Sequence, residues 1–182
     1  LDMTPVDGRL TDLAGLGHLA KDDGVRLFLC DSTNAEEAGF SASETSIGQS
    51  IHDLFRARVD QRIIVACFAS HIHRVQQIAD AAIACGRTVA TLGRSMNQNV
   101  ALARQMGLLR FPDDRLVDIE DVTGIPDEKL WVISTGSQGE PMSALARMAA
   151  GDKRWVEVRE GDGVVLQQLD GVPVREGQHG DA

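Results

Sequence analysis

The sequence contains no apolar run long enough to cross a membrane. Its longest uncharged stretches, such as Ile63 to Ile72, fall far short of the roughly 20 residues that a membrane helix needs. No secretory signal is visible and the chain begins with Leu1, so we expect a piece of a longer protein. Its three cysteines form no CxxC pair, which argues against a structural zinc of the chain's own. Each lies in or beside an apolar run, and we expect reduced core thiols in a cytoplasmic protein.

Acidic residues are almost absent from one stretch of an otherwise acidic chain. The 182 residues are 43% hydrophobic and 25% charged, as in ordinary globular proteins, and the net charge is −9. Between Gln61 and Arg110, however, six arginines face a single acid, Asp80. Guanidinium groups suit phosphate oxygens, and local charge decides what a groove attracts. This arginine block is therefore either a phosphate-binding surface or a helical surface that happens to be basic; charge alone leaves both open.

Short apolar runs alternate with helical patterns and predict a doubly wound α/β fold over residues 24–158, with a mostly parallel sheet and flanking helices. The expected strands are 25–30, 63–68, 88–92 and 130–134. The expected helices begin at the caps Ser43, Ser70 and Ser95 and at Met142. Residues 1–23 are expected to be a leading segment with a short helix. After Asp152 we expect two short strands, at 155–159 and 164–169, and a disordered tail within 159–182.

Four segments follow the carboxyl ends of the expected strands, where ligands of doubly wound sheets bind. They are Asp31–Asn34, Ser70–Arg74, Gly93–Asn97 and Thr135–Glu140, and all are polar, small or cationic. This coincidence predicts a site. Asp31 is a carboxylate beside two hydroxyls that either orients a histidine or a metal-bound water, or caps its own turn; the sequence leaves both roles open.

Two of these segments favour an anionic ligand. Ser70-His71-Ile72-His73-Arg74 contains the H-x-H of a binuclear metal site, but Arg74 stands where an aspartate is needed, and a cation opposes metal binding. Two histidines and an arginine at a helix start suit a phosphodiester better, the alternative being a helix cap with a solvent-facing histidine. Arg94 and Ser95 repeat the pattern after the next strand, and we expect Arg94 to contact phosphate directly.

Two further motifs resemble known ones without matching them. Thr135-Gly136-Ser137-Gln138-Gly139 is close to the nucleophile elbow G-x-S-x-G, but its first glycine is replaced and only His179 follows it downstream. We interpret Gly136, Ser137 and Gln138 as a small-residue turn whose N–H groups face an anion. The segment Gly15–Ala20 matches the dinucleotide pattern G-x-G-x-x-A but lacks the preceding strand, so we assign it no nucleotide role.

Four segments together resemble bacterial ribonuclease J, and the similarity runs from Leu1 to about Asp162. The segments are Asp31–Glu36, Phe68–Ile78, Gly93–Met96 and Thr135–Pro141, in the order of the family. Ribonuclease J is a metallo-β-lactamase-fold RNase of the β-CASP group with 5′-to-3′ exonuclease and endonuclease activities. The resemblance implies that this chain is the β-CASP domain of a zinc-dependent RNase of RNA processing and decay.

The same resemblance implies roles for individual residues. Asp31 corresponds to the motif A acid, which supports the catalytic centre without binding metal. The loops at Ser70–Arg74 and Gly93–Ser95 would hold RNA phosphates, and Thr135–Glu140 would form part of the same wall. The implied partners are single-stranded RNA with a 5′-monophosphate end and the metallo-β-lactamase domain; a homo-oligomer of the intact protein is also open.

Several family motifs are missing from the chain. The metal motif H-x-H-x-D-H and the S-G-H-A and H-G-E segments are absent, so we expect this chain alone to bind no zinc and to lack nuclease activity. Residues 163–171 resemble a strand from much later in these proteins. Two other hypotheses stay open: a stand-alone α/β module that binds a nucleotide or sugar phosphate, and a non-catalytic remnant that acts through protein contacts.

Overall fold

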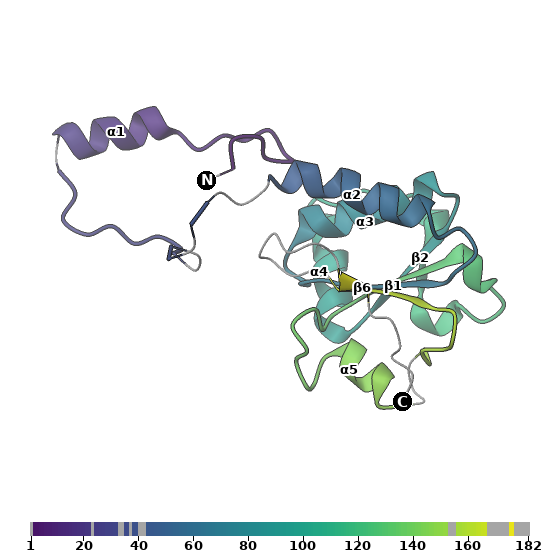
Figure 1. Ribbon diagram of the computed structural model, residues 1–182. Helices are drawn as coiled ribbons and strands as arrows, with labels where there is room; N and C mark the ends of the chain where they lie inside the picture. The colour runs from purple at the N-terminus through teal and green to yellow at the C-terminus, as the bar shows by residue number, and fades with distance from the viewer. Residues whose placement is uncertain are drawn as a thin grey trace.

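The computed structural model of the chain describes residues 2–22, 24–32, 35–36, 38–39, 43–152, 156–166 and 175–176. These residues form a six-stranded sheet in the order β3-β2-β4-β1-β5-β6 (Figure 1). Neighbouring strands from β3 to β5 pair in parallel, and β6 runs antiparallel to β5. The predicted α/β fold with a mostly parallel sheet is therefore confirmed. The strands are β1 (Ile63–Ala66), β2 (Thr88–Leu92), β3 (Leu116–Asp118), β4 (Leu130–Ser134), β5 (Gly163–Leu166) and β6 (Arg175–Glu176).

Helices cover both faces of the sheet. One face packs against α2 (Glu44–Arg56), α3 (Ile72–Ala84) and α4 (Arg94–Gln105). The other packs against α5 (Ala144–Ala149), against residues 117–125, which include the end of β3 and a short 3₁₀ helix (Ile119–Asp121), and against irregular chain at 156–158. By contrast, α1 (Leu13–Asp22) buries none of its residues and lies apart from the sheet (Figure 1). In the described part of the chain, no helix is long and apolar enough to span a bilayer.

α2 illustrates how the sequence builds the larger core. The Ser43 side chain accepts a hydrogen bond from the Thr45 N–H and so caps the helix as predicted. Ile51 and Phe55, one turn apart on the inner face, are fully buried. The Phe55 ring meets Trp131 of β4 edge-on with centroids 4.1 Å apart. Burial of such an aromatic side chain contributes roughly 1.5–3 kcal/mol, which fixes α2 against the centre of the sheet.

The connections change sides around β4. The helices that follow β1 and β2 lie on one face, whereas the helix that follows β4 lies on the other. Adjacent strands whose connections leave toward opposite faces open a crevice at their carboxyl ends, and ligands of doubly wound sheets bind there. The segments after β1, β2 and β4 are therefore placed together by topology.

The predicted strand at 25–30 is wrong. No strand is formed by the described residues 24–32, and Leu27, Phe28 and Leu29 are each at least 70% exposed. An apolar run shows that residues favour burial, but a strand also needs a partner for its backbone groups. Both sides of β1 are taken by β4 and β5, and no described strand pairs with this segment. Figure 1 shows the chain after α1 lying apart from the sheet before it returns to α2.

Two helices are capped by a residue near the predicted serine rather than by the serine itself. α3 is capped by His71 rather than Ser70, and α4 begins after Gly93 rather than Ser95.

β3 lies in a stretch of mixed charge that shows no strand pattern in the sequence. β5 overlaps the predicted strand 164–169 but begins one residue earlier, and it pairs in parallel with β1 and antiparallel with β6 rather than with residues 156–159. Most of the predicted strand at 155–159 is irregular, its first residue lies outside the described part, and so does the region 167–169.

Candidate functional site

Three of the four predicted segments meet at the carboxyl edge of the sheet. Beyond the ends of β1 and β4, the Cys67 N–H still donates to the Ser134 carbonyl at 3.0 Å. A Cβ atom on Gly93, where φ is +112°, would come within 3.1 Å of Thr135 Oγ1 and 3.4 Å of the Ala144 Cβ. The segment after β2 thus packs closely on the segment after β4, and a larger residue than glycine would push them apart.

The turn after β4 is held largely by its own contacts. At Gly136 φ is +116°, and a Cβ there would lie 2.5 Å from Ser143 Oγ, so only glycine fits. The N–H of Gln138 donates to the Glu140 carboxylate at 3.2 Å, and that of Gly139 donates to the Gly136 carbonyl at 3.2 Å. Of the three residues predicted to face an anion, Gln138 thus has its N–H engaged within the turn, and the role of Gly136 and Ser137 stays a prediction. The Gln138 side chain remains exposed.

Ser137 is the exception within this turn. Its side chain is only 2% exposed, and its Oγ has no hydrogen-bond partner among the described residues. A buried hydroxyl without a partner costs about 1–3 kcal/mol relative to a satisfied one. Such an atom is uncommon in folded proteins and is a candidate for contact with a ligand.

Arg94 begins α4 and is exposed to solvent. Because Gly93 has no side chain, no side-chain hydrogen bond from the cap reaches the first-turn N–H groups at the positive end of the helix dipole. Ser95 is exposed beside Arg94. Within the described part of the chain, Arg94 has no ion pair. A cation, a hydroxyl and an uncapped N-terminus at one place favour an anion.

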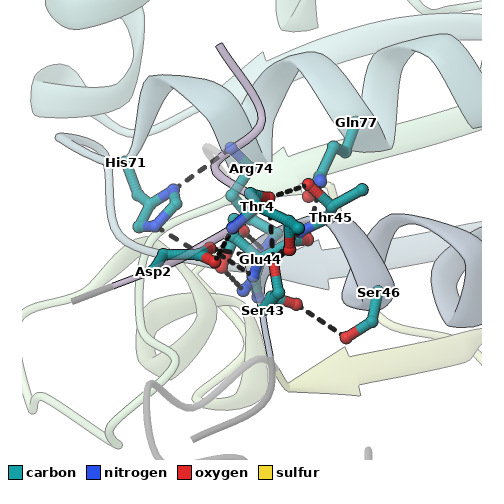
Figure 2. Close-up of polar contacts among 9 residues, drawn as sticks. All are labelled: Asp2, Thr4, Ser43, Glu44, Thr45, Ser46, His71, Arg74 and Gln77. Atoms are coloured by element: carbon teal, nitrogen blue, oxygen red, sulfur yellow. Dashed lines mark hydrogen bonds and ion pairs between the residues drawn. The ribbon is translucent and has the colours of Figure 1, made fainter. Parts of the chain in front are cut away.

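Arg74 lies at a comparable position in α3 but is buried. Its Nε and Nη2 donate to the two carboxylate oxygens of Glu44, at 2.6 and 2.7 Å (Figure 2). The Arg74 side chain is only 7% exposed. The folded chain therefore does not offer this guanidinium to a phosphate, and the predicted direct contact by Arg74 is revised to an ion pair inside the protein.

The two histidines of the same segment differ in their surroundings. His71 Nδ1 accepts from the Arg74 N–H at 3.1 Å and caps α3, so its ring proton is on Nε2, which lies 3.8 Å from the Glu44 carboxylate. His73 is about half exposed, with Nε2 3.9 Å from the Asp7 carboxylate. Ser70 is exposed in the turn before them. Ser70 and His73 are thus the side chains of this segment that solvent reaches most freely.

Sequence reasoning missed Glu44 and the leading residues Asp2 and Thr4, which bind the start of α2. Asp2 accepts from the Thr4 N–H at 2.9 Å, from the Ser43 hydroxyl at 2.9 Å and from the Glu44 N–H at 3.1 Å (Figure 2). Hydrogen bonding, above all from Thr4, lowers the pKa of Asp2. The Thr45 hydroxyl donates to the Thr4 carbonyl at 2.6 Å. A glutamate after a helix cap is too common to signal such a role in the sequence.

The six arginines of the block differ in their contacts. Four are engaged inside the protein, and only Arg94 and Arg110 have side chains without an ion pair or hydrogen bond to any residue that the structure describes. Three of the six arginines are buried and a fourth is paired at the surface, so the positive stretch does not form a positive surface of equal size. Arg62 pairs with Asp162, Arg74 with Glu44 and Arg104 with Asp113, and Arg87 donates to the carbonyls of Arg58 and Gln61.

Asp31 does not emerge from the sheet as predicted. It is exposed and follows residues 24–30, which form no strand, so it does not stand at the end of a buried strand. The core placement expected for all three cysteines also holds only in part, because Cys67 is buried whereas Cys30 is exposed. Burial raises the pKa of the Cys67 thiol to about 12, which keeps it protonated and unreactive at neutral pH.

The residues present do not fit a metal ion. Across the described ranges, no group of three or more His, Cys, Asp or Glu side chains could hold one. His71 and His73, the pair with metal-like spacing, are oriented by Arg74 and Asp7 instead. We therefore derive no chemical step through zinc for this chain.

Comparison with known proteins places this chain in a family. The family model described as "Ribonuclease J, beta-CASP domain" matches residues 60–174. The chain is 49% identical to ribonuclease J of Mycolicibacterium smegmatis and 51% identical to that of Mycobacterium tuberculosis, over 91% of its length and 29% of theirs. Ribonuclease J of Thermus thermophilus is 41% identical, over 28% of that protein. The chain thus spans under a third of these relatives, and it belongs to the ribonuclease J β-CASP domain family.

Proposed function

We propose that this chain is the RNA-holding part of a ribonuclease J-like, zinc-dependent RNase of the cytoplasm, with 5′-to-3′ exonuclease and endonuclease activities. Family membership supports an RNase role, and the carboxyl edge of the sheet supports a site for phosphates. Zinc would belong to the intact enzyme, together with a metallo-β-lactamase domain, and the described residues of this chain do not supply its ligands.

The observation that carries the proposal is the start of α4. Arg94 is the one arginine of the block that is exposed, lacks an ion pair with any described residue and stands at a helix N-terminus. The dipole adds to the guanidinium charge, so both favour the same phosphate. Ser95 adds a hydroxyl at the same helix start, and the partnerless Ser137 hydroxyl belongs to the neighbouring turn.

The remaining residues extend this surface along the edge. Ser70 and His73 lie on the segment after β1, and their exposure allows hydrogen bonds to further phosphates. Gln138 is exposed in the turn after β4, and the tight backbone of this turn requires Gly136. A surface built from three neighbouring segments suits a chain of nucleotides better than a single nucleotide. Asp31 keeps its proposed role as the supporting motif A acid on the resemblance alone.

The proposal is tested by RNA binding of the 182-residue chain. Its affinity for 5′-phosphorylated single-stranded RNA should rise over several added nucleotides, because each one reaches another part of the edge. With about three phosphates neutralised, log K against log salt should have a slope near −2, at roughly −0.7 per phosphate. Affinity that stops rising at the first nucleotide would favour a mononucleotide pocket, and affinity that does not change with salt would contradict the proposal.

A further inference from the structure

Glu44 connects two helix starts at the edge where the proposed RNA surface lies. It is the first residue of α2, and its carboxylate reaches across to Arg74 in the first turn of α3 and toward His71, the cap of α3. Its backbone is held as well, since Asp2 accepts from its N–H and the Gln77 amide donates to its carbonyl at 2.9 Å (Figure 2). The side chain, the N–H and the carbonyl of Glu44 are thus all engaged.

The charges explain why α3 needs this carboxylate. An arginine in the first turn of a helix opposes the helix dipole, and a buried guanidinium without a partner is strongly unfavourable. Glu44 neutralises Arg74 through two hydrogen bonds in the parallel geometry that carboxylates and guanidinium groups prefer. Without it, Arg74 would have to turn toward solvent and would pull on the helix start to which Ser70, His71 and His73 belong.

We propose that Glu44 is a positioning residue for the RNA-binding segment at residues 70–73, and that Arg74 serves this segment through Glu44 rather than by touching phosphate. The inference rests on the proposed RNA binding. It assigns a function to a negatively charged residue beside a surface for a negatively charged ligand.

The test compares Glu44→Gln with Asp53→Asn in the 182-residue chain. Asp53 lies on the same helix and is largely exposed, and among the described residues its carboxylate has polar contacts only with Gln49 and His52, so its variant removes the same charge without touching the segment. Removing a negative charge should by itself tighten binding to RNA, as we expect slightly for Asp53→Asn. Glu44→Gln should instead weaken binding to single-stranded oligouridylate of about ten nucleotides by about tenfold, at a temperature where the protein is folded.

The salt dependence separates positioning from release of a competing charge. If Glu44 positions the segment and Arg74 never contacts phosphate, Glu44→Gln should leave the slope of log K against log salt unchanged. Tighter binding with a steeper slope would show that Arg74 can bind phosphate and that Glu44 competes with it, which would overturn the proposal. Unchanged affinity, with only a lower melting temperature, would reduce Glu44 to a structural role and also overturn it.

A second variant and a second readout keep the result independent of folding and of RNA. Should Glu44→Gln be unfolded, Glu44→Asp keeps the charge with a shorter reach, and it must weaken binding without changing the slope. The amide NMR signals of residues 70–73 should shift in Glu44→Gln but not in Asp53→Asn, with no RNA present. If these signals do not move, the proposal is wrong; if they move while the unaltered chain binds no RNA, the proposed function fails instead.

Discussion

The segments that lead from β1 into α3 and from β2 into α4 follow the same sequence pattern: a buried strand, small or polar residues, and an arginine in the first turn of a helix. In the first segment a histidine caps the helix, and the Glu44 carboxylate accepts hydrogen bonds from Nε and Nη2 of Arg74. In the second, glycine leaves the helix uncapped and Arg94 stays exposed without an ion pair to any described residue. Two segments with the same sequence pattern thus differ in how the helix is capped and in what the arginine contacts.

The difference shows that an arginine at a helix start can serve two purposes. Where a carboxylate from another helix reaches it, the arginine fastens two helices together, and its charge is cancelled inside the protein. Where none reaches it, its charge adds to the helix dipole, and both attract an anion from outside the chain. Only contacts with distant parts of the chain decide between the two, since Glu44 and Arg74 are 30 residues apart.

The largest expected effect is on stability and comes from breaking the buried pair. Arg74→Ala should lower the free energy of unfolding by about 3 kcal/mol, because it leaves the half-buried Glu44 carboxylate without its cation. For a chain of this size that corresponds to a fall in melting temperature of roughly 6–12 °C. Arg94→Ala, at the equivalent exposed position, should change stability by no more than about 0.5 kcal/mol. Calorimetric melting of both variants measures the comparison, and equal losses would contradict the division into a structural and a ligand-facing arginine.

A smaller effect is expected at the glycine that leaves α4 uncapped. Gly93→Ala should cost about 2 kcal/mol, because it combines a positive φ with a contact of 3.1 Å to Thr135. Gly107, just beyond the end of α4, also has a positive φ, of +69°, but a Cβ there would meet nothing within 4 Å. Its alanine variant is therefore the control and should cost about 1 kcal/mol, the strain alone. Denaturant unfolding of the two variants gives the difference, and an equal cost would mean that the segments after β2 and β4 do not need their close contact.

The sequence predicts well those features that depend on local pattern. The bounds of β2 and β4 follow from short apolar runs between turn residues, and Ser43 caps α2 as a hydroxyl before an amphipathic helix should. The meeting of the segments after β1, β2 and β4 also follows from sequence, because parallel strands joined by helices must all end at one edge. The sequence therefore predicted which three segments lie together at this edge, and their binding of phosphate stays a prediction.

The features that sequence reasoning missed depend on partners far along the chain. The run at 25–30 has the composition of a strand but finds no strand beside it among the described residues. β3 has too few apolar residues to show a pattern, and it forms because the edge of β2 offers it backbone hydrogen bonds. The burial of Arg74 required knowing that α2 packs beside α3, which no spacing in the sequence reveals.

The most direct measurement of the central claim compares Arg94→Ala with Arg110→Ala in binding to single-stranded RNA over a series of salt concentrations. Both arginines are exposed and lack ion pairs with described residues, so the variants lose the same charge, but only Arg94 stands at a helix N-terminus. We predict that Arg94→Ala weakens binding several-fold and makes the slope of log K against log salt shallower by about 0.7, the contribution of one phosphate, whereas Arg110→Ala leaves the slope nearly unchanged. Equal effects of the two variants, or no effect of Arg94→Ala on either quantity, would contradict the claim that the start of α4 is the phosphate site.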